Sequence, residues 1–131
     1  MLRIPTTLDP AIEELVHQTI GCCITVHREL GPGLIEQAYG RAVGYELAAN
    51  GIPFEREKGF PISYRGEYLY MHRLDLLVAG KIVLELKAVE RLHPVHHAQL
   101  LSMLRTLKLR VGLLINFNVP VLPEGIRRIV L

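Results

Sequence analysis

The chain has 131 residues, 50% of them hydrophobic and 21% charged, which is typical of an ordinary folded protein. Its formal net charge of +2 permits a nucleic-acid partner, but no dense cluster of Lys and Arg indicates one. The sequence has neither a signal peptide nor an apolar run of the ~18 residues that a membrane helix needs. We therefore expect a cytoplasmic protein without a membrane partner.

The only cysteines, Cys22 and Cys23, are adjacent, which argues against a disulfide between them and against a Cys-x-x-Cys zinc site. We expect them to be small buried side chains of a reducing compartment. No internal repeat, low-complexity tract or linker divides the sequence, so a single domain over residues 1–131 is predicted.

Two helices are predicted in the N-terminal part of the chain. Asp9-Pro10 is a typical helix start, and apolar residues then recur at helical spacing until the Gly-Pro-Gly of residues 31–33. A second helix is expected from about residue 34 to 50. It contains Gly40 and Gly44, which destabilise a helix, so we expect another backbone to approach that face closely.

Strand-like segments follow, and the helical period returns once. Short strands are expected at residues 54–58 and 61–64 and from residue 67 onward, a helix at 94–108, and two further strands at 111–117 and 126–131. This order predicts an α/β fold with a central mixed sheet of four to six strands, flanked by helices and including one crossover through the later helix.

The stretch RLDLLVAGKIVLELKAV (residues 73–89) carries Asp75, Glu85 and Lys87 inside apolar runs. Charged side chains are rare in buried strands unless they are paired or ligate something. Residues two apart in a strand face the same side, so Glu85 and Lys87 point together. If residues 79–81 form a three-residue loop, Asp75 lies opposite Glu85, about 5 Å away at Cβ. A two-residue loop would place the two acids on opposite faces.

Two interpretations of these charges follow. Carboxylates this close repel each other, and a divalent cation such as Mg²⁺ would relieve the repulsion. Lys87 beside such an ion could orient or deprotonate water and stabilise charge on a phosphate, which suits phosphodiester hydrolysis. Alternatively, Lys87 forms a structural salt bridge with Glu85 or Asp75, and the spacing alone does not decide between the two.

The pattern of Asp75 followed by Glu85-Leu86-Lys87 resembles the Asp…Glu-x-Lys signature of the PD-(D/E)XK nuclease superfamily. Residues 33–39, GLIEQAY, match the Gly-x-x-Glu-x-x-Tyr motif of the GxxExxY protein family, small bacterial and archaeal proteins within that superfamily. The segments VHRELGPGL, ELKAVERLHPVHHAQLL and GLLINFNV are similar to this family too. The resemblance implies a restriction-endonuclease-like core and a metal-dependent nuclease acting on DNA or structured nucleic acid.

The resemblance also implies a metal site. Asp75, Glu85 and the backbone carbonyl of Leu86 match the positions that bind Mg²⁺ in the superfamily, where Mn²⁺ can substitute. An acid on the preceding helix often completes the site, and Glu36 matches it. The lysine of the signature, which would position or activate water, matches Lys87.

A glutamine on the later helix often contacts the site or the substrate, and Gln99 matches it as a third catalytic candidate beside Lys87 and Glu36. A Tyr often follows that Gln by four residues, but Met103 stands there, which affects substrate contact rather than metal binding. Three further side chains are candidate substrate contacts: Tyr39, Arg73 and His96.

Two questions stay open at the level of sequence. A non-catalytic nucleic-acid-binding or assembly module on the same fold is the alternative function, favoured by small size and opposed by the intact Asp, Glu and Lys. The apolar C-terminal segment IRRIVL could pair with a second copy and form a homodimer.

His93, His96 and His97 lack the well-spaced partners of a zinc site.

Overall fold

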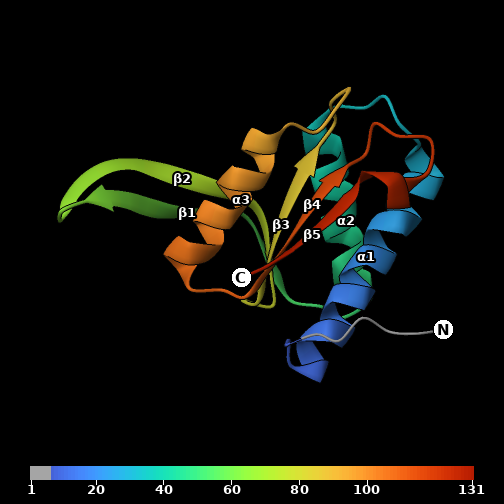
Figure 1. Cartoon of the computed structure of the whole chain (residues 1–131). Helices are drawn as coiled ribbons and strands as arrows, with labels where there is room; N and C mark the ends of the chain where they lie inside the picture. The colour runs from blue at the N-terminus through green and yellow to red at the C-terminus, as the bar shows by residue number, and fades with distance from the viewer. Residues whose placement is uncertain (1–6) are drawn as a thin grey trace.

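The computed structural model describes residues 7–131, which form a five-stranded mixed sheet with helices on both faces (Figure 1). The elements in chain order are α1 (Pro10–Leu30), α2 (Glu36–Ala49), β1 (Phe54–Tyr64), β2 (Glu67–Val78), β3 (Ile82–Lys87), α3 (Pro94–Leu107), β4 (Val111–Asn116), the 3₁₀ helix η1 (Leu122–Gly125) and β5 (Ile126–Val130). The predicted α/β class and the central mixed sheet flanked by helices are confirmed. Within residues 7–131, no helix is long and apolar enough to span a membrane.

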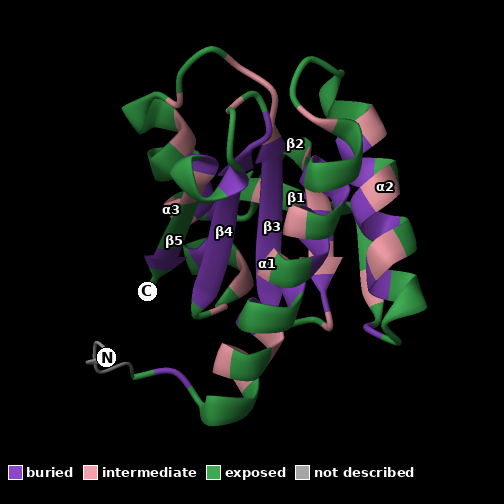
Figure 2. Ribbon diagram, turned by 90° about the vertical axis from the view of Figure 1, so that its right-hand side faces the viewer, coloured by how far each residue is buried: buried purple, intermediate pink, exposed green. Residues whose placement is uncertain are grey.

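The strands lie in the sheet in the order of the sequence, from β1 to β5. All neighbouring pairs are antiparallel except β3 and β4, which are parallel and are connected through α3. This is the crossover that the sequence predicts. The two central strands β3 and β4 are buried along their length, between α3 on one side and α1 and α2 on the other (Figure 2).

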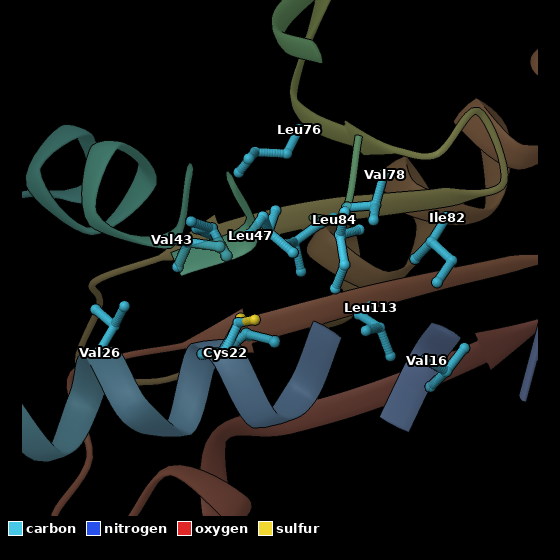
Figure 3. Packing of buried hydrophobic residues seen from close by; sticks show 14 of the residues in the cluster. Val16, Cys22, Val26, Val43, Leu47, Leu76, Val78, Ile82, Leu84 and Leu113 are labelled. Atoms are coloured by element: carbon cyan, nitrogen blue, oxygen red, sulfur yellow. The ribbon is translucent and has the colours of Figure 1, made fainter. Parts of the chain in front are cut away.

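The larger part of the hydrophobic core lies between the sheet and the helices α1 and α2. Figure 3 shows side chains of both helices meeting those of β2, β3 and β4; the labelled members are Val16, Cys22, Val26, Val43, Leu47, Leu76, Val78, Ile82, Leu84 and Leu113. Burial of each Val, Leu or Ile contributes roughly 1.5–3 kcal/mol. A second cluster on the opposite face joins α3 to the sheet and includes Leu100, Leu104 and Val83. Both cysteines are buried and free, as expected.

The first strand is longer than the sequence predicts. The two short strands expected at 54–58 and 61–64 are one continuous strand, β1, in which Pro61 pairs with Met71. Proline is tolerated there because β1 is the edge strand of the sheet, where a missing N–H interrupts no second neighbour. β1 and β2 together form a long hairpin that projects beyond the other strands, and we call this projection the arm (Figure 1).

The β2–β3 turn has a three-residue loop, which decides between the two loop lengths that the sequence left open. Val78 pairs with Ile82, and the pairing of β2 with β3 extends only to Leu76 and Leu84. Beyond that point β2 leaves β3 and continues into the arm. Leu74 packs in the α3-side cluster whereas Leu76 packs in the cluster under α1 and α2, so the strand turns at Asp75. We call the opening between β2 and β3 past Leu76 the fork.

Tyr39 fixes the loop that leads into α2. Its ring is fully buried and stacks on Phe117, with ring centroids 4.4 Å apart. Its hydroxyl donates a hydrogen bond to the carbonyl of Gly31 (2.6 Å) and accepts one from the N–H of Leu34 (3.1 Å). The loop between α1 and α2 is therefore tied to the core, which sets where α2 begins.

We expect the substitution Tyr39→Phe to lower the free energy of unfolding by about 1–3 kcal/mol, because both partners of the buried hydroxyl lose a hydrogen bond. Urea denaturation followed by circular dichroism measures the loss. The matched control is Tyr45→Phe on the same helix, where the Tyr is 68% exposed and the change should stay within ~0.5 kcal/mol. Equal losses in the two variants would contradict a role for the Tyr39 hydroxyl.

Candidate metal centre in the fork

Two acidic side chains meet in the fork. The register that pairs Leu76 with Leu84, continued by one residue, brings Asp75 opposite Glu85. Side chains replace the strand hydrogen bonds at this point: Leu86 N–H donates to Asp75 Oδ2 (2.7 Å), and Asp75 N–H donates to Glu85 Oε1 (3.3 Å). Each carboxyl group is thus held by the backbone of the opposite strand.

The environment of Glu85 disfavours a second negative charge. Its side chain is only 7% exposed, and burial is the main cause that raises its pKa from 4.5 to about 8. The charge of Asp75 raises this pKa as well, while the hydrogen bond from the Asp75 N–H and the charge of Lys87 lower it. At neutral pH the pair therefore retains a proton at Glu85, at the place where a cation would remove the repulsion.

Lys87 is the last residue of β3 and is half-buried beside this pair. Within residues 7–131 no ion pair joins Lys87 to Asp75 or to Glu85, so the structural salt bridge considered from the sequence is not formed. The charge of Lys87 acts on two groups, because it lowers the pKa of Glu85 and that of His96 on α3. The ammonium group is thus near the acids and available for another partner.

Asn116 holds the end of β3 in place, and sequence reasoning missed it. This last residue of β4 is 3% exposed, and its amide bonds both backbone groups of Val89: Nδ2 donates to the carbonyl (2.9 Å) and Oδ1 accepts from the N–H (3.0 Å). The next residue, Phe117, donates its N–H to the carbonyl of Lys87 (2.8 Å). Asn116 could have been noticed in the sequence, because it is the one polar side chain in the apolar run VGLLINF.

Glu36 is the first residue of α2 and is exposed. Its charge raises the pKa of His96 while that of Lys87 lowers it, so these three groups share one end of the sheet. In the described part of the chain, however, no three His, Cys, Asp or Glu side chains gather into a metal-binding group. Glu36 therefore stands apart from Asp75 and Glu85, and direct coordination by all three acids is not formed here.

The first turn of α3 brings two histidines to the same region. His96 Nδ1 accepts a hydrogen bond from the backbone N–H of His93 (3.1 Å), which caps the helix. Partial burial, the charge of Lys87 and that of His93 lower the pKa of His96. A neutral imidazole that accepts at Nδ1 carries its proton on Nε2 and can donate it. Gln99 follows one turn later and is exposed, while Met103 is buried in the core.

The structure treats the other two candidate substrate contacts differently. Tyr39 is fully buried and its hydroxyl is engaged, so the prediction that Tyr39 contacts a substrate is wrong in this structure. The hydroxyl of Tyr39 bonds the backbone of the loop between α1 and α2. The spacing of residues in the sequence could not predict how this loop folds over the ring. Arg73 is exposed on β2, two residues before Asp75, and remains a candidate substrate contact.

The groups in the fork suit a hard divalent cation. The donors are two carboxylates and the Leu86 carbonyl, and oxygen ligands of this kind favour Mg²⁺ or Mn²⁺ over Zn²⁺. Leu86 directs its N–H toward Asp75, and the carbonyl of a strand residue points to the same side as its N–H. A cation would also favour loss of the proton from Glu85, because its positive charge would offset the charges of the two carboxylates.

The raised pKa of Glu85 predicts a pH dependence of stability without metal. The folded state holds the Glu85 proton up to about pH 8, whereas the unfolded chain releases it near 4.5, so stability should fall as pH rises through this window. The slope is at most about 1.4 kcal/mol per pH unit. Glu85→Gln should remove this fall and be more stable than the wild type at alkaline pH.

Urea denaturation in EDTA between pH 5 and 9 measures the effect, and Glu90→Gln, at an exposed position after β3, is the matched control. Wild-type and Glu85→Gln curves that run parallel over this range would show that Glu85 is not buried as described.

Comparison with known proteins agrees with this geometry. A family model described as the PD-(D/E)XK nuclease superfamily matches residues 13–129, almost the whole chain. No curated protein and no solved structure gives a significant match. The match spans both acids of the fork, Lys87 and the helices around them, and the mixed sheet agrees with a restriction-endonuclease-like fold. The chain therefore belongs to the PD-(D/E)XK nuclease superfamily, whose members generally use divalent metals.

Proposed function

We propose that this protein is a Mg²⁺-dependent nuclease that hydrolyses phosphodiester bonds of DNA, and that residues 33–39 place it in the GxxExxY family. The observation that carries the proposal is the placement of Asp75 opposite Glu85, with each carboxylate bound by the backbone of the other strand, beside a Lys87 that forms no ion pair with either acid. A buried pair of acids with a raised pKa is typical of a functional site, and membership of a nuclease superfamily supports the reaction class.

The roles of the residues follow from their positions. Asp75, Glu85 and the Leu86 carbonyl would hold the ion, and Glu36 would reach it through a water molecule. The bound ion would supply charge stabilisation at phosphorus and a more acidic water. Lys87, which is free of ion pairs to the acids, would orient the attacking water or contact a phosphate oxygen.

The groups on α3 would contact the substrate. His96 can donate its Nε2 proton, and Gln99 has an exposed amide. Both residues lie in the N-terminal part of α3, where the charge of Lys87 acts on His96. Arg73 approaches from the arm. Homodimer formation through β5 remains a proposal as well; β5 is an edge strand that pairs with β4 alone.

The second candidate is a non-catalytic nucleic-acid-binding module. The observation in its favour is that Glu36 does not join the two acids among the residues that the structure describes. The two functions differ in what they require of Asp75 and Lys87, because a binding module needs neither residue for turnover.

We expect Asp75→Asn and Lys87→Ala each to lower Mg²⁺-dependent DNA cleavage by about 100-fold or more while the protein stays folded. The assay covers single-stranded and double-stranded DNA and RNA, with Mg²⁺ and with Mn²⁺. Lys81→Ala, at the exposed tip of the same hairpin, is the matched control and should retain activity. Wild-type protein that cleaves none of these substrates would leave the binding module as the better function.

Mg²⁺ should also stabilise the folded protein through the two acids. At an ion concentration of 100 times the dissociation constant, binding adds about 2.7 kcal/mol to the free energy of unfolding. Differential scanning fluorimetry should show a rise in melting temperature with Mg²⁺ in the wild type and none in Asp75→Asn. A rise of the same size in both would place the ion elsewhere.

A further inference from the structure

Arg56 of β1 lies along the surface of α2 at two glycines. A methyl group at Gly44 would come within 3.3 Å of Arg56 Cδ, and one at Gly40 would lie 3.7 Å from Arg56 Nη2. Phe54 fills the remaining space at Gly44, 3.2 Å from the same position. The expected close approach of another backbone at these glycines is thus wrong: two side chains of the neighbouring edge strand occupy that face.

The side chain of Arg56 runs along α2 toward Glu36 and the side chain of Leu86. Glu36, Gly40 and Gly44 are four residues apart and share one stripe of α2. Arg56 passes from Gly44 toward Gly40, so its guanidinium points to the end of the helix that begins with Glu36. A methyl group at Gly40 would also meet Leu86 Cδ1 at 4.0 Å, and the backbone of Leu86 holds Asp75.

The guanidinium has no partner in the described part of the chain. The side chain of Arg56 makes neither an ion pair nor a hydrogen bond within residues 7–131, although its Nη2 lies beside Gly40, one helical turn from Glu36. Its side chain is exposed, so its donors face solvent. The absence of a side chain at Gly44, which costs up to about 1 kcal/mol relative to Ala, leaves room for this placement. An arginine held in position with its donors unused is suited to an external anion.

The chemistry of that anion follows from the residue type. A guanidinium is a planar fork of donors that binds a phosphate through two parallel hydrogen bonds, which a lysine does not reproduce. The positive end of the α2 dipole lies at the same end of the helix and favours an anion there too. A cation cannot be the ligand, because like charges repel.

We propose that Arg56 forms a phosphate subsite, binding a backbone phosphate of the DNA strand on the α2 side of the fork, next to the bond that is cleaved. This inference rests on the proposed function in taking DNA as the ligand that crosses the fork. Arg56 would position the strand and take no part in bond breaking.

The test measures DNA binding in the Asp75→Asn background, in which cleavage is removed. Fluorescence anisotropy with a fluorescein-labelled DNA duplex and single strand gives the dissociation constant over a series of salt concentrations. Arg56→Gln should weaken binding about tenfold and lower the slope of log K against log salt by about one, because one phosphate contact is lost. Arg56→Lys should keep most of the slope but bind more weakly.

The matched control is Arg105→Gln, because Arg105 is exposed and lies at the other end of α3, away from the fork. It should leave the slope and the dissociation constant unchanged. In the protein that retains Asp75, Arg56→Gln should raise KM for DNA more than it lowers kcat.

The outcomes separate this inference from the proposed function. A slope that falls in Arg56→Gln supports the subsite even if no variant ever cleaves DNA. An unchanged slope, or an equal fall in Arg105→Gln, overturns the subsite even if the wild type is an active nuclease. An absence of measurable DNA binding overturns it as well.

Discussion

The placement of Asp75 opposite Glu85, at the point where β2 and β3 part, is the constraint around which the rest of the site is arranged. Burying an acid beside another acid is unfavourable, and burial together with the charge of Asp75 raises the pKa of Glu85. The sheet tolerates the pair because β2 stops pairing with β3 after Leu76, which lets side chains take the backbone hydrogen bonds that a partner strand would take. The same departure opens the fork and sends β2 into the arm.

Lys87 lies beside this pair and Arg56 lies on the neighbouring surface of α2, and neither forms an ion pair with the two acids. Lys87 is fixed by the backbone bonds at the end of β4 and forms no ion pair with the acids, and Arg56 is held by the glycine face of α2 one turn from Glu36. An arrangement selected for stability alone would pair these charges, since an unpaired partner near a buried acid leaves its charge uncompensated. Their separation is what a site needs when a metal ion and a phosphate are to fill the space between them.

Much of the fold was predictable because the sequence carries local signals for it. Asp9 caps α1, the loop at 79–81 sets the hairpin register, and that register alone brings the two acids together. What could not be predicted depends on the position of an element in the sheet. Pro61 lies inside β1 because β1 is an edge strand, and Tyr39 is buried because a loop folds over its hydroxyl. The path of Arg56 is likewise a property of two packed elements.

The arm is connected directly to the acid pair through β2. Asp75 lies at the point where β2 turns out of the sheet, so the strand that carries this acid is also the root of a projecting lever. The exposed Tyr64 and Tyr68 lie near its tip, and Tyr68 is seven residues before Asp75 in β2. A partner that pushes on the tip would apply a torque at the root, and the separation of the two acids would change with it. The tip of the arm and the acid of the proposed metal site thus belong to one strand, along which a load on the tip would be transmitted.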